Sequence, residues 1–473
     1  MSIPSTEPRT VIILAAGQGT RMKSTLPKVL HRIAGASLLV HAIQSVLPLS
    51  PERIVVVVGH GREQVESEVR ARFGDLVTFA VQSQQRGTAD AVRAAIPMIP
   101  YSSTEVLITY GDCPLVPTSL LKQLLDERAQ SVARVSVATA EISDPTGYGR
   151  IVRDVRGHVT AIREHKDCTP AEREITLINA GLYAMDRAFL ERGLAAVSSD
   201  NAQGEFYLTD LVAMAARESE RASAGAGCIE VRGRANLLRG INDRVELADA
   251  EVSMLEIIHD RWRRAGNTIA RGARIECDVV LEGDVTVAQG AVLRGKTVVR
   301  TGSVVDVGCI LEDAIVDVNV LLKPYSIVVQ SEVGARAQIG PFAHVRPASV
   351  IGEDAHVGNF VELKKTRMGR GAKANHLAYL GDGVIGERAN IGAGTIFCNY
   401  DGFQKHTTTI GEGAFVGSNS SLVAPVTIGD DAYVGSGSVV TRDVPSGALA
   451  VGRARQEIKE GYVARIRALK KKP

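Results

Sequence analysis

Residues 279–308 read VVLEGD-VTVAQG-AVLRGK-TVVRTG-SVVDVG, a run of six-residue blocks. An apolar or β-branched residue returns at a fixed position of each block, and glycine or another small residue stands near the block ends. This period is typical of a parallel β-helix, in which each block adds one short strand to a triangular prism. A single rung cannot bury its own inward-pointing residue, so many rungs have to stack.

The same period begins near Ile269 and continues for roughly 170 residues, which predicts a long prism. Such prisms commonly pack side by side, so we expect a homo-oligomer. The repeat is interrupted at residues 399–408, NYDGFQKHTT. An insertion in a solenoid forms a loop on one face, which is often the functional face.

The N-terminal part of the chain has a different texture. Short apolar runs without polar alternation are separated by segments with helical patterns, which predicts a mostly parallel sheet covered by helices on both faces. The expected strands lie at 11–14, 54–58, 106–109 and 135–138, and two of the expected helices lie at 38–46 and 119–130.

Between the two parts, apolar residues recur at helical spacing from Val245 to Trp262 with no glycine or proline between them. The pattern predicts one long amphipathic helix. We interpret it as a linker between domains, although a helix packed within either domain fits the pattern equally well. The expected organisation is a first domain at 1–240, a linker helix at 241–266 and a β-helix domain at 267–473.

The composition is that of a folded globular chain. Its 473 residues are 45% hydrophobic and 23% charged, with a net charge of +2. This balance gives no overall attraction to nucleic acid or membrane. The 6 scattered cysteines fit neither a zinc site nor a disulfide framework, and the chain shows no signal segment. We therefore expect a cytoplasmic protein.

A glycine-rich turn follows the first expected strand, in the stretch LAAGQGTRMKSTLPKVLH at 14–31. Backbone N–H groups in such a turn can bind a phosphate. The third glycine of a dinucleotide motif is missing, and the cations Arg21, Lys23 and Lys28 follow. Together these features favour a triphosphate ligand over a dinucleotide. The alternative is a structural turn flanked by solvated basic residues.

This stretch resembles the opening signature of sugar-1-phosphate nucleotidyltransferases. Together with the hexapeptide repeats, nearly the whole chain resembles the bifunctional N-acetylglucosamine-1-phosphate uridylyltransferase / glucosamine-1-phosphate N-acetyltransferase family. The resemblance implies a Rossmann-like nucleotidyltransferase domain, a long helix and a left-handed parallel β-helix. It also implies a homotrimer with acetyltransferase sites shared between subunits, UTP and acetyl-CoA as substrates, and Mg²⁺ as cofactor.

The resemblance implies a role for each N-terminal motif. Arg21 and Lys28 would neutralise phosphates, and Asp112 with Asn242 would hold Mg²⁺, for which oxygen ligands are suited. This chain departs from the family at Asp90, where histidine is frequent, and at Asp243, where asparagine is frequent. The implied nucleotide and sugar contacts are Leu14, Ala15, Ala16, Gly17, Lys28, Gln82, Gly87, Thr88, Tyr110, Gly111, Asp112, Gly149, Glu164, Asn179 and Asn242.

Acetyl transfer to an amine needs a base that works near neutral pH, and histidine suits that task. His376 matches the family's proton acceptor, and Glu362 would orient or stabilise its imidazolium. Ser436 stands where alanine is expected. The implied substrate contacts are Arg346, Lys364, Tyr379 and Asn390, and the implied acetyl-CoA contacts are Ala393, Asn399, Tyr400, Ser418, Ser436 and Arg453.

Two other functions remain as alternatives. One is a single-activity sugar-1-phosphate nucleotidyltransferase in which the β-helix is only a scaffold. The other is a non-catalytic regulatory subunit that keeps both folds. The residues around His376 argue against the first, and the joint presence of Arg21, Lys28, Asp112 and His376 argues against the second.

Overall fold

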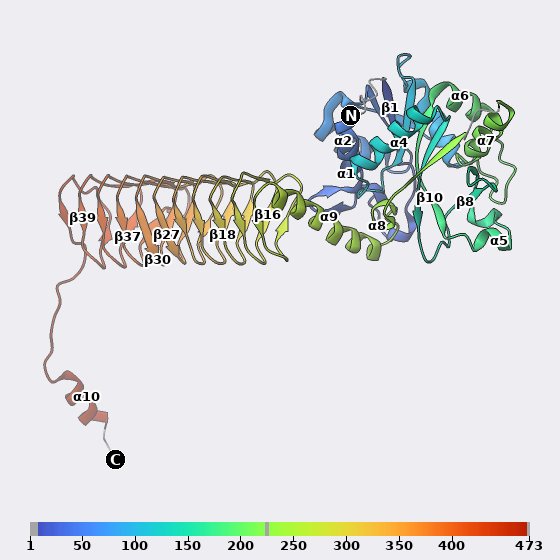
Figure 1. Ribbon diagram of the computed structural model, residues 1–473. Coiled ribbons are helices and arrows are strands. Elements are labelled where there is room, and N and C mark those ends of the chain that lie inside the picture. The colour runs from blue at the N-terminus through green and yellow to red at the C-terminus, as the bar shows by residue number, and fades with distance from the viewer. Residues whose placement is uncertain (1–7, 223–226, 471–473) are drawn as a thin grey trace. The chain divides into compact units, whose positions relative to one another are not determined.

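The computed structural model describes residues 8–222 and 227–470. Contacts divide the chain into two compact units, Met1–Met254 and Leu255–Pro473. The first contains a sheet flanked by helices, and the second is a stack of short strands (Figure 1).

The sheet of the first unit has the strand order β11-β7-β10-β6-β1-β4-β5. All neighbours along this path are parallel except β10, which runs antiparallel to both β6 and β7. The strands are β1 (Arg9–Leu14), β4 (Arg53–Val58), β5 (Val77–Val81), β6 (Glu105–Tyr110), β7 (Val135–Glu141), β10 (Leu177–Asp186) and β11 (Cys228–Arg232), with β8 (Arg150–Arg153) and β9 (Val159–Arg163) beside β10. The predicted α/β fold is confirmed.

Helices cover both faces of this sheet. Val11 and Ile13 of β1 belong to one hydrophobic core, and Ile12 and Leu14 belong to another. Because successive β1 residues are buried on opposite faces, the strand shows no polar alternation. The first core includes α1 (Leu38–Val46), α2 (Arg62–Phe73) and α4 (Thr118–Ser131), and the second includes α3 (Thr88–Ala95), α6 (Arg187–Ala196) and α7 (Asp210–Ala222).

Helix α9 (Arg244–Arg264) is a continuous helix of 21 residues. It begins directly after Asp243 and extends past the division between Met254 and Leu255. Two shorter helices of the first unit are α5 (Pro170–Arg173) and α8 (Ala235–Leu238).

The second unit is built from two- to four-residue strands, from β12 (Thr268–Ile269) to β41 (Leu449–Ala450). In the described residues they form three parallel sheets of 11, 10 and 9 strands, so each turn of the chain adds one strand to each sheet. Val287 lies over Val305, and Leu293 lies over Leu311, in exact register. These side chains are fully buried, which confirms the predicted β-helix with one inward position in each block of six.

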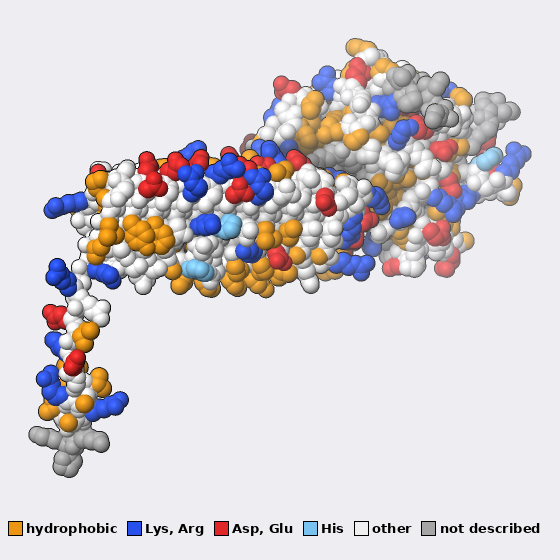
Figure 2. Space-filling model, turned by 60° about the vertical axis from the view of Figure 1, so that its left-hand side comes forward, with side chains coloured by type: hydrophobic (Ala, Val, Ile, Leu, Met, Phe, Trp, Pro, Cys, Tyr) orange, Lys and Arg blue, Asp and Glu red, His pale blue; other side chains and the backbone are white. Residues whose placement is uncertain are grey.

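One corner of the prism carries an exposed column of aromatic side chains, Tyr325, Phe342 and Phe360. Their rings stack with centroids 5.3 and 5.4 Å apart. All three have positive φ, a conformation that bulky residues rarely adopt, and each ring is about half exposed. The view of the prism in Figure 2 likewise shows hydrophobic side chains gathered in patches on its surface.

The last helix of the described residues, α10 (Tyr462–Lys470), has no buried side chain. Among the described residues, the structure contains no helix that is long and apolar enough to cross a membrane.

Candidate active sites

The first site lies where strands β1 and β6 end side by side. Their register pairs Leu14 with Tyr110, so the glycine-rich turn and Asp112 meet at the carboxyl edge of the sheet, where α/β sheets bind ligands. Gly111 donates its N–H to the carbonyl of Leu14 at 2.9 Å. A cavity of about 340 Å³ there is lined by the predicted residues Leu14, Ala15, Ala16, Gly17, Lys28, Gln82, Gly87, Thr88, Tyr110 and Asp112.

Two glycines permit close contacts around this cavity. Gly19 has a φ of 63°, and a Cβ there would lie 2.4 Å from the Cβ of Lys28. Gly87 has a φ of 111°, and a Cβ there would lie 2.5 Å from the carbonyl oxygen of Phe206. Any larger residue at either position would force the neighbouring chain away from the site.

Lys28 joins two residues that lie far apart in the sequence. Its ammonium forms an ion pair with Asp112 and donates a 2.9 Å hydrogen bond to Oδ1 of Asn242. The side chains of Lys28 and Asp112 are mostly buried, at 13% and 17% exposure. The structure therefore brings together the predicted phosphate-binding lysine and both predicted metal ligands.

The oxygens of Asp112 and Asn242 face one point, which is marked by the Lys28 ammonium. Mg²⁺ prefers such oxygen donors and commonly takes one or two from the protein and the rest from water and substrate phosphates. Within residues 8–222 and 227–470 there is no cluster of three or more His, Cys, Asp or Glu side chains suited to a metal. A two-oxygen donor set fits a divalent ion that binds together with the nucleotide.

Asp243 has a structural role next to this site. Its Oδ1 accepts the backbone N–H groups of Val245 and Glu246, each at 2.9 Å. These are hydrogen bonds of a helix N-cap, which satisfy donors that the first turn of α9 cannot pair. The extra carboxylate at this position therefore holds the start of α9 and, through it, the neighbouring Asn242.

Gln82, the residue expected to read uracil, is held by Asp90. Nε2 of Gln82 donates to Oδ2 of Asp90 at 3.1 Å and to the carbonyl of Gly87 at 3.2 Å. Asp90 is also paired with Arg86 at 2.7 Å. The aspartate at this position fixes the direction of the glutamine amide, because it accepts the amide's N–H.

A second cavity, of about 480 Å³, adjoins the first. Its lining contains the predicted residues Arg21, Thr88, Tyr110, Asp112, Gly149, Glu164, Asn179 and Asn242. A Cβ at Gly149 would lie 2.9 Å from Ile162 and 3.4 Å from a carboxylate oxygen of Glu164. A glycine at this position keeps the space beside Glu164 open to a ligand.

Burial raises the pKa of Glu164 above its ordinary value, and the nearby carboxylates of Asp167, Asp210 and Glu205 act in the same direction. A hydrogen bond of 3.2 Å from the hydroxyl of Thr209 partly opposes the shift. A partly desolvated carboxylate that lines a polar cavity is a strong acceptor for ligand hydroxyl or amide groups.

Sequence reasoning missed several residues that line these two cavities: Gln85, Cys113, Tyr148, Gln203, Glu205, Tyr207, Arg239 and Glu246. Gln203, Glu205 and Tyr207 had no periodic or motif signal of their own, whereas Gln85 lies between the predicted contacts Gln82 and Gly87. Tyr148, however, directly precedes the predicted sugar contact Gly149, and Arg239 lies three residues before the predicted metal ligand Asn242. Their places beside predicted site residues were the signal that could have identified Tyr148 and Arg239.

The second site lies on the prism at His376, the last residue of β30 (Lys373–His376). Its Nδ1 is 2.7 Å from Oδ1 of Asn359, the last residue of β27 (His356–Asn359). Because an amide oxygen can only accept a hydrogen bond, Nδ1 is the protonated ring nitrogen in this contact, and Nε2 keeps the lone pair that can act as a base. Asn359 lies one rung, or 17 residues, before His376, and the stacking period was the signal that could have found it.

Glu362 does not contact His376 within this chain. Its Oε1 accepts from Nη1 of Arg346 at 2.6 Å, and the ion pair is about one-third exposed on each side. Glu362 lies on β28 (Glu362–Lys364), which is paired in register with Tyr379 of β31 (Tyr379–Gly381). Within the described residues, Glu362 therefore contacts Arg346, a predicted sugar-phosphate ligand, and Asn359 contacts His376.

Lys405 adds a cation to this region. The pKa of Lys364 is lowered, chiefly by contact with the Lys405 side chain and then by the charges of Lys405 and Arg346. Three cations gathered on one surface are suited to an anionic group such as a phosphate. Lys405 lies in the predicted insertion, between β34 (Ile396–Cys398) and β35 (Thr408–Ile410).

The insertion forms an ordered loop around Asp401. Its carboxylate accepts the N–H groups of Phe403 and Gln404 and contacts Nε2 of His406 at 2.7 Å. These bonds hold the pKa of Asp401 well below its usual range. Within the loop, Tyr400 donates its hydroxyl to the carbonyl of Gly402 at 2.6 Å and remains 60% exposed.

The residues expected to bind acetyl-CoA occupy successive rungs. The backbone N–H of Asn419 donates to the carbonyl of Ala393 at 2.7 Å, and the backbone N–H of Gly437 donates to the carbonyl of Ser418 at 2.8 Å. Ser436 directly precedes Gly437 and therefore lies one rung after Ser418. Asn399 donates to Asp382 at 2.6 Å, whereas Arg453 lies beyond β41 and is exposed.

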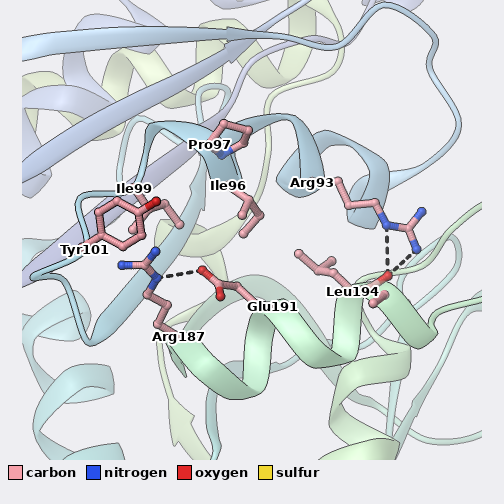
Figure 3. Close-up of a pocket in the computed structure, with 9 residues that line it drawn as sticks. Arg93, Ile96, Pro97, Ile99, Tyr101, Arg187, Glu191 and Leu194 are labelled. Carbon is pink, nitrogen blue, oxygen red and sulfur yellow. Dashed lines mark hydrogen bonds and ion pairs between the residues drawn. The ribbon is translucent and has the colours of Figure 1, made fainter.

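A separate cavity of about 560 Å³ lies between the end of α3 and helix α6 (Figure 3). Its charged side chains have structural partners. Arg187 pairs with Glu191 at 2.7 Å, and Arg93 donates to the carbonyls of Leu194 and Val197. None of the residues predicted for catalysis lines this cavity.

Comparison with known proteins agrees with this geometry. Residues 11–194 match the MobA-like NTP transferase domain, residues 275–368 match the GMPPB C-terminal domain, and residues 407–442 match the bacterial transferase hexapeptide repeats. The fold and sites therefore define a nucleotidyltransferase domain joined to a left-handed hexapeptide β-helix of the transferase type.

The chain is 53% identical to the bifunctional protein GlmU of Sorangium cellulosum, over 98% of this chain and 97% of that protein. It is 49% identical to GlmU of Anaeromyxobacter sp. (98% and 94% covered) and 42% identical to GlmU of Heliobacterium modesticaldum (97% and 98% covered). The chain belongs to the GlmU family of bifunctional uridylyltransferases and acetyltransferases in UDP-N-acetylglucosamine synthesis. The single-activity and regulatory alternatives are not favoured.

Proposed function

We propose that the cavities at the carboxyl edge of the first sheet transfer UMP from UTP to N-acetylglucosamine-1-phosphate. The convergence of Lys28, Asp112 and Asn242 carries this assignment. A phosphate oxygen of the sugar phosphate forms a bond to the α-phosphorus of UTP, and the bond to the β-phosphate oxygen breaks. Pyrophosphate leaves with the electron pair. The reaction requires alignment and charge stabilisation rather than a covalent nucleophile.

Asp112 and Asn242 would hold Mg²⁺, which would neutralise phosphate charge when bound. Lys28 and Arg21 would place two more positive charges along the triphosphate. Lys28 contacts both proposed ligand residues, which places its ammonium where the phosphates would bind. Gln82 would read the uracil, and Glu164 and Asn179 would bind the sugar.

On the prism, His376 would remove a proton from the amine of glucosamine-1-phosphate as the amine attacks the thioester carbonyl of acetyl-CoA. CoA leaves as the thiolate and takes up a proton. Asn359 would hold the imidazole in the basic tautomer, because its oxygen accepts from Nδ1. Arg346, oriented by Glu362, would bind the sugar phosphate with Lys364 and Lys405.

Tyr379 and Asn390 would bind the sugar. The remaining acetyl-CoA contacts would come from Ala393, Asn399, Tyr400, Ser418, Ser436 and Arg453. The proposed domain bounds are 1–240 and 267–473, with 241–266 as the linker.

A homotrimer is supported by the aromatic column of Tyr325, Phe342 and Phe360. Exposed aromatic surface of this kind is characteristic of interfaces, and the column ends beside the site. Phe360 directly follows Asn359, the partner of His376. A second copy packed on the column would therefore lie next to the catalytic histidine and complete the acetyltransferase site.

The test is a product assay with glucosamine-1-phosphate, acetyl-CoA, UTP and Mg²⁺, with one component omitted at a time. UDP-N-acetylglucosamine should form only when all four are present. Asp112→Ala should abolish uridylyl transfer alone, and His376→Ala should abolish acetyl transfer alone. Loss of both activities in either variant would contradict two independent sites.

A further inference from the structure

The cavity of about 480 Å³ has two rims that meet at one arginine. Tyr148 and Gly149 form one rim, and Gly240, Asn242 and Glu246 form the other. Arg239 belongs to the second rim and reaches the first, since its Nε donates to the hydroxyl of Tyr148 at 3.5 Å.

A chain of polar contacts runs from Arg239 to a proposed metal ligand. One Nη of Arg239 lies 3.6 Å from Oε1 of Glu246. The other carboxylate oxygen, Oε2, accepts the backbone N–H of Asn242 at 2.6 Å. Nδ2 of Asn242 donates to the carbonyl of Gly240 at 2.9 Å, so its Oδ1 faces Lys28. Glu246 thus shares its two oxygens between Asn242 and Arg239.

The Tyr148 rim is anchored from its other side by a buried residue. Arg150 is 1% exposed and donates to the carbonyl of Tyr148. The amide of Tyr148 donates to the carbonyl of Pro145 at 3.1 Å, and Gly149 accepts the N–H of Asn179 at 2.8 Å. The Tyr148 hydroxyl faces the second rim, where it accepts the hydrogen bond from Arg239.

Arg239 also balances a negative charge in a cavity proposed to take an anion. Glu246 lines that cavity, and its carboxylate would repel a sugar phosphate and the triphosphate. The guanidinium of Arg239 offsets this charge. The pKa of Arg239 is raised, first by its bond to Tyr148 and also by the nearby carboxylates of Glu246 and Asp249, so the group stays charged.

We propose that Arg239 is a positioning residue for uridylyl transfer: it joins the Tyr148 rim to Glu246 and Asn242 and neutralises Glu246 where the sugar phosphate enters. This inference rests on the proposed assignment of the cavity. The side chain of Arg239 is 55% exposed, and exposed ion pairs add little to stability. Its loss should therefore change catalysis far more than folding.

The experiment compares Arg239→Met, Arg239→Lys, Glu246→Gln and Arg239→Met/Glu246→Gln in the full chain. Arg192→Met is a matched control, because Arg192 pairs with Glu218 at 3.7 Å, is 60% exposed and does not line the cavity. For each protein, kcat and KM for N-acetylglucosamine-1-phosphate and UTP are measured, together with the acetyltransferase rate and Tm.

Arg239→Met should raise KM for the sugar phosphate about 10-fold, with KM for UTP changed less than about 3-fold and the acetyltransferase rate and Tm unchanged. Arg239→Lys should retain part of the affinity, because it keeps the charge. The double variant should bind the sugar phosphate more tightly than Arg239→Met, because the repelling carboxylate is gone.

An unchanged KM for the sugar phosphate in Arg239→Met would overturn the inference, as would an equal effect in Arg192→Met. If the double variant were no better than Arg239→Met, the charge-balancing role would be wrong. A wild-type chain without uridylyltransferase activity would instead contradict the proposed function, so the two failures can be told apart.

Discussion

Nδ1 of His376 lies 2.7 Å from Oδ1 of Asn359, one rung away on the same face of the prism. The contact links two β-strands that are paired in parallel register, so the backbone fixes the position of both side chains. A neutral amide thus selects the histidine tautomer with a free Nε2. Glu362, the carboxylate expected to orient or stabilise the imidazolium, is paired with Arg346.

Asn359→Ala should therefore lower the acetyltransferase rate on the order of 10- to 100-fold, since the imidazole loses the partner that orients it. Uridylyl transfer measured on the same protein should be unchanged. Glu362→Gln is the comparison: it should mainly raise KM for glucosamine-1-phosphate, because it weakens the hold on Arg346. If Glu362→Gln lowered kcat more than Asn359→Ala did, the assignment of Asn359 would be wrong.

Lys28→Met should lower the uridylyltransferase kcat on the order of 100- to 1,000-fold, because a mostly buried cation beside the proposed phosphate site is lost. The acetyltransferase rate serves as the internal control for folding. Lys23→Met is the matched control, because Lys23 lies on the same turn, is exposed and does not line either cavity. Equal losses in the two variants would argue against a specific role of Lys28.

Glu164→Gln should stabilise the first unit at neutral pH while it weakens binding of N-acetylglucosamine-1-phosphate. Folding raises the pKa of Glu164, so the native state favours the protonated form. Ionising Glu164 in the native state lowers the free energy of unfolding. This loss is absent below the ordinary carboxyl pKa and complete above the raised pKa.

The stabilisation by Glu164→Gln should thus be present at neutral pH and should shrink as the pH falls through the raised pKa toward the ordinary carboxyl pKa. Thermal unfolding of the full chain at several pH values measures it. A destabilised variant at neutral pH would mean that the carboxylate is favoured in the native state, which contradicts the expected direction of the pKa.

Phe360→Asp should dissociate the proposed trimer and abolish acetyl transfer while uridylyl transfer continues. The substitution places a charge on an exposed aromatic surface that we expect to be buried between copies. Sedimentation velocity gives the oligomeric state and the two assays give the activities. Tyr101→Asp, at a 99% exposed position of the first unit, is the control for a general effect of an exposed aspartate. A Phe360→Asp protein that stays trimeric would exclude the column from the interface.

The local sequence pattern determined the two folds. The six-residue period placed Leu281, Val287 and Leu293 on the inside of the prism, because a side chain at each sixth position meets the same environment. Val11 to Leu14 likewise indicated a strand buried on both faces. The glycine-rich turn and the neighbouring cations indicated a phosphate site, because turn geometry and charge are local properties.

The tertiary structure alone decided which side chains share a partner. The contact of Lys28 with Asn242 spans 214 positions, and the contacts of Arg239 with Tyr148 and of Glu246 with Asn242 depend on how the sheet edge and α9 come together. The contact of Asn359 with His376 follows from strand register. Which side chains pair depends on their distances in space, and periodicity and composition do not encode those distances. Burial along a strand or rung, in contrast, follows the period of the sequence.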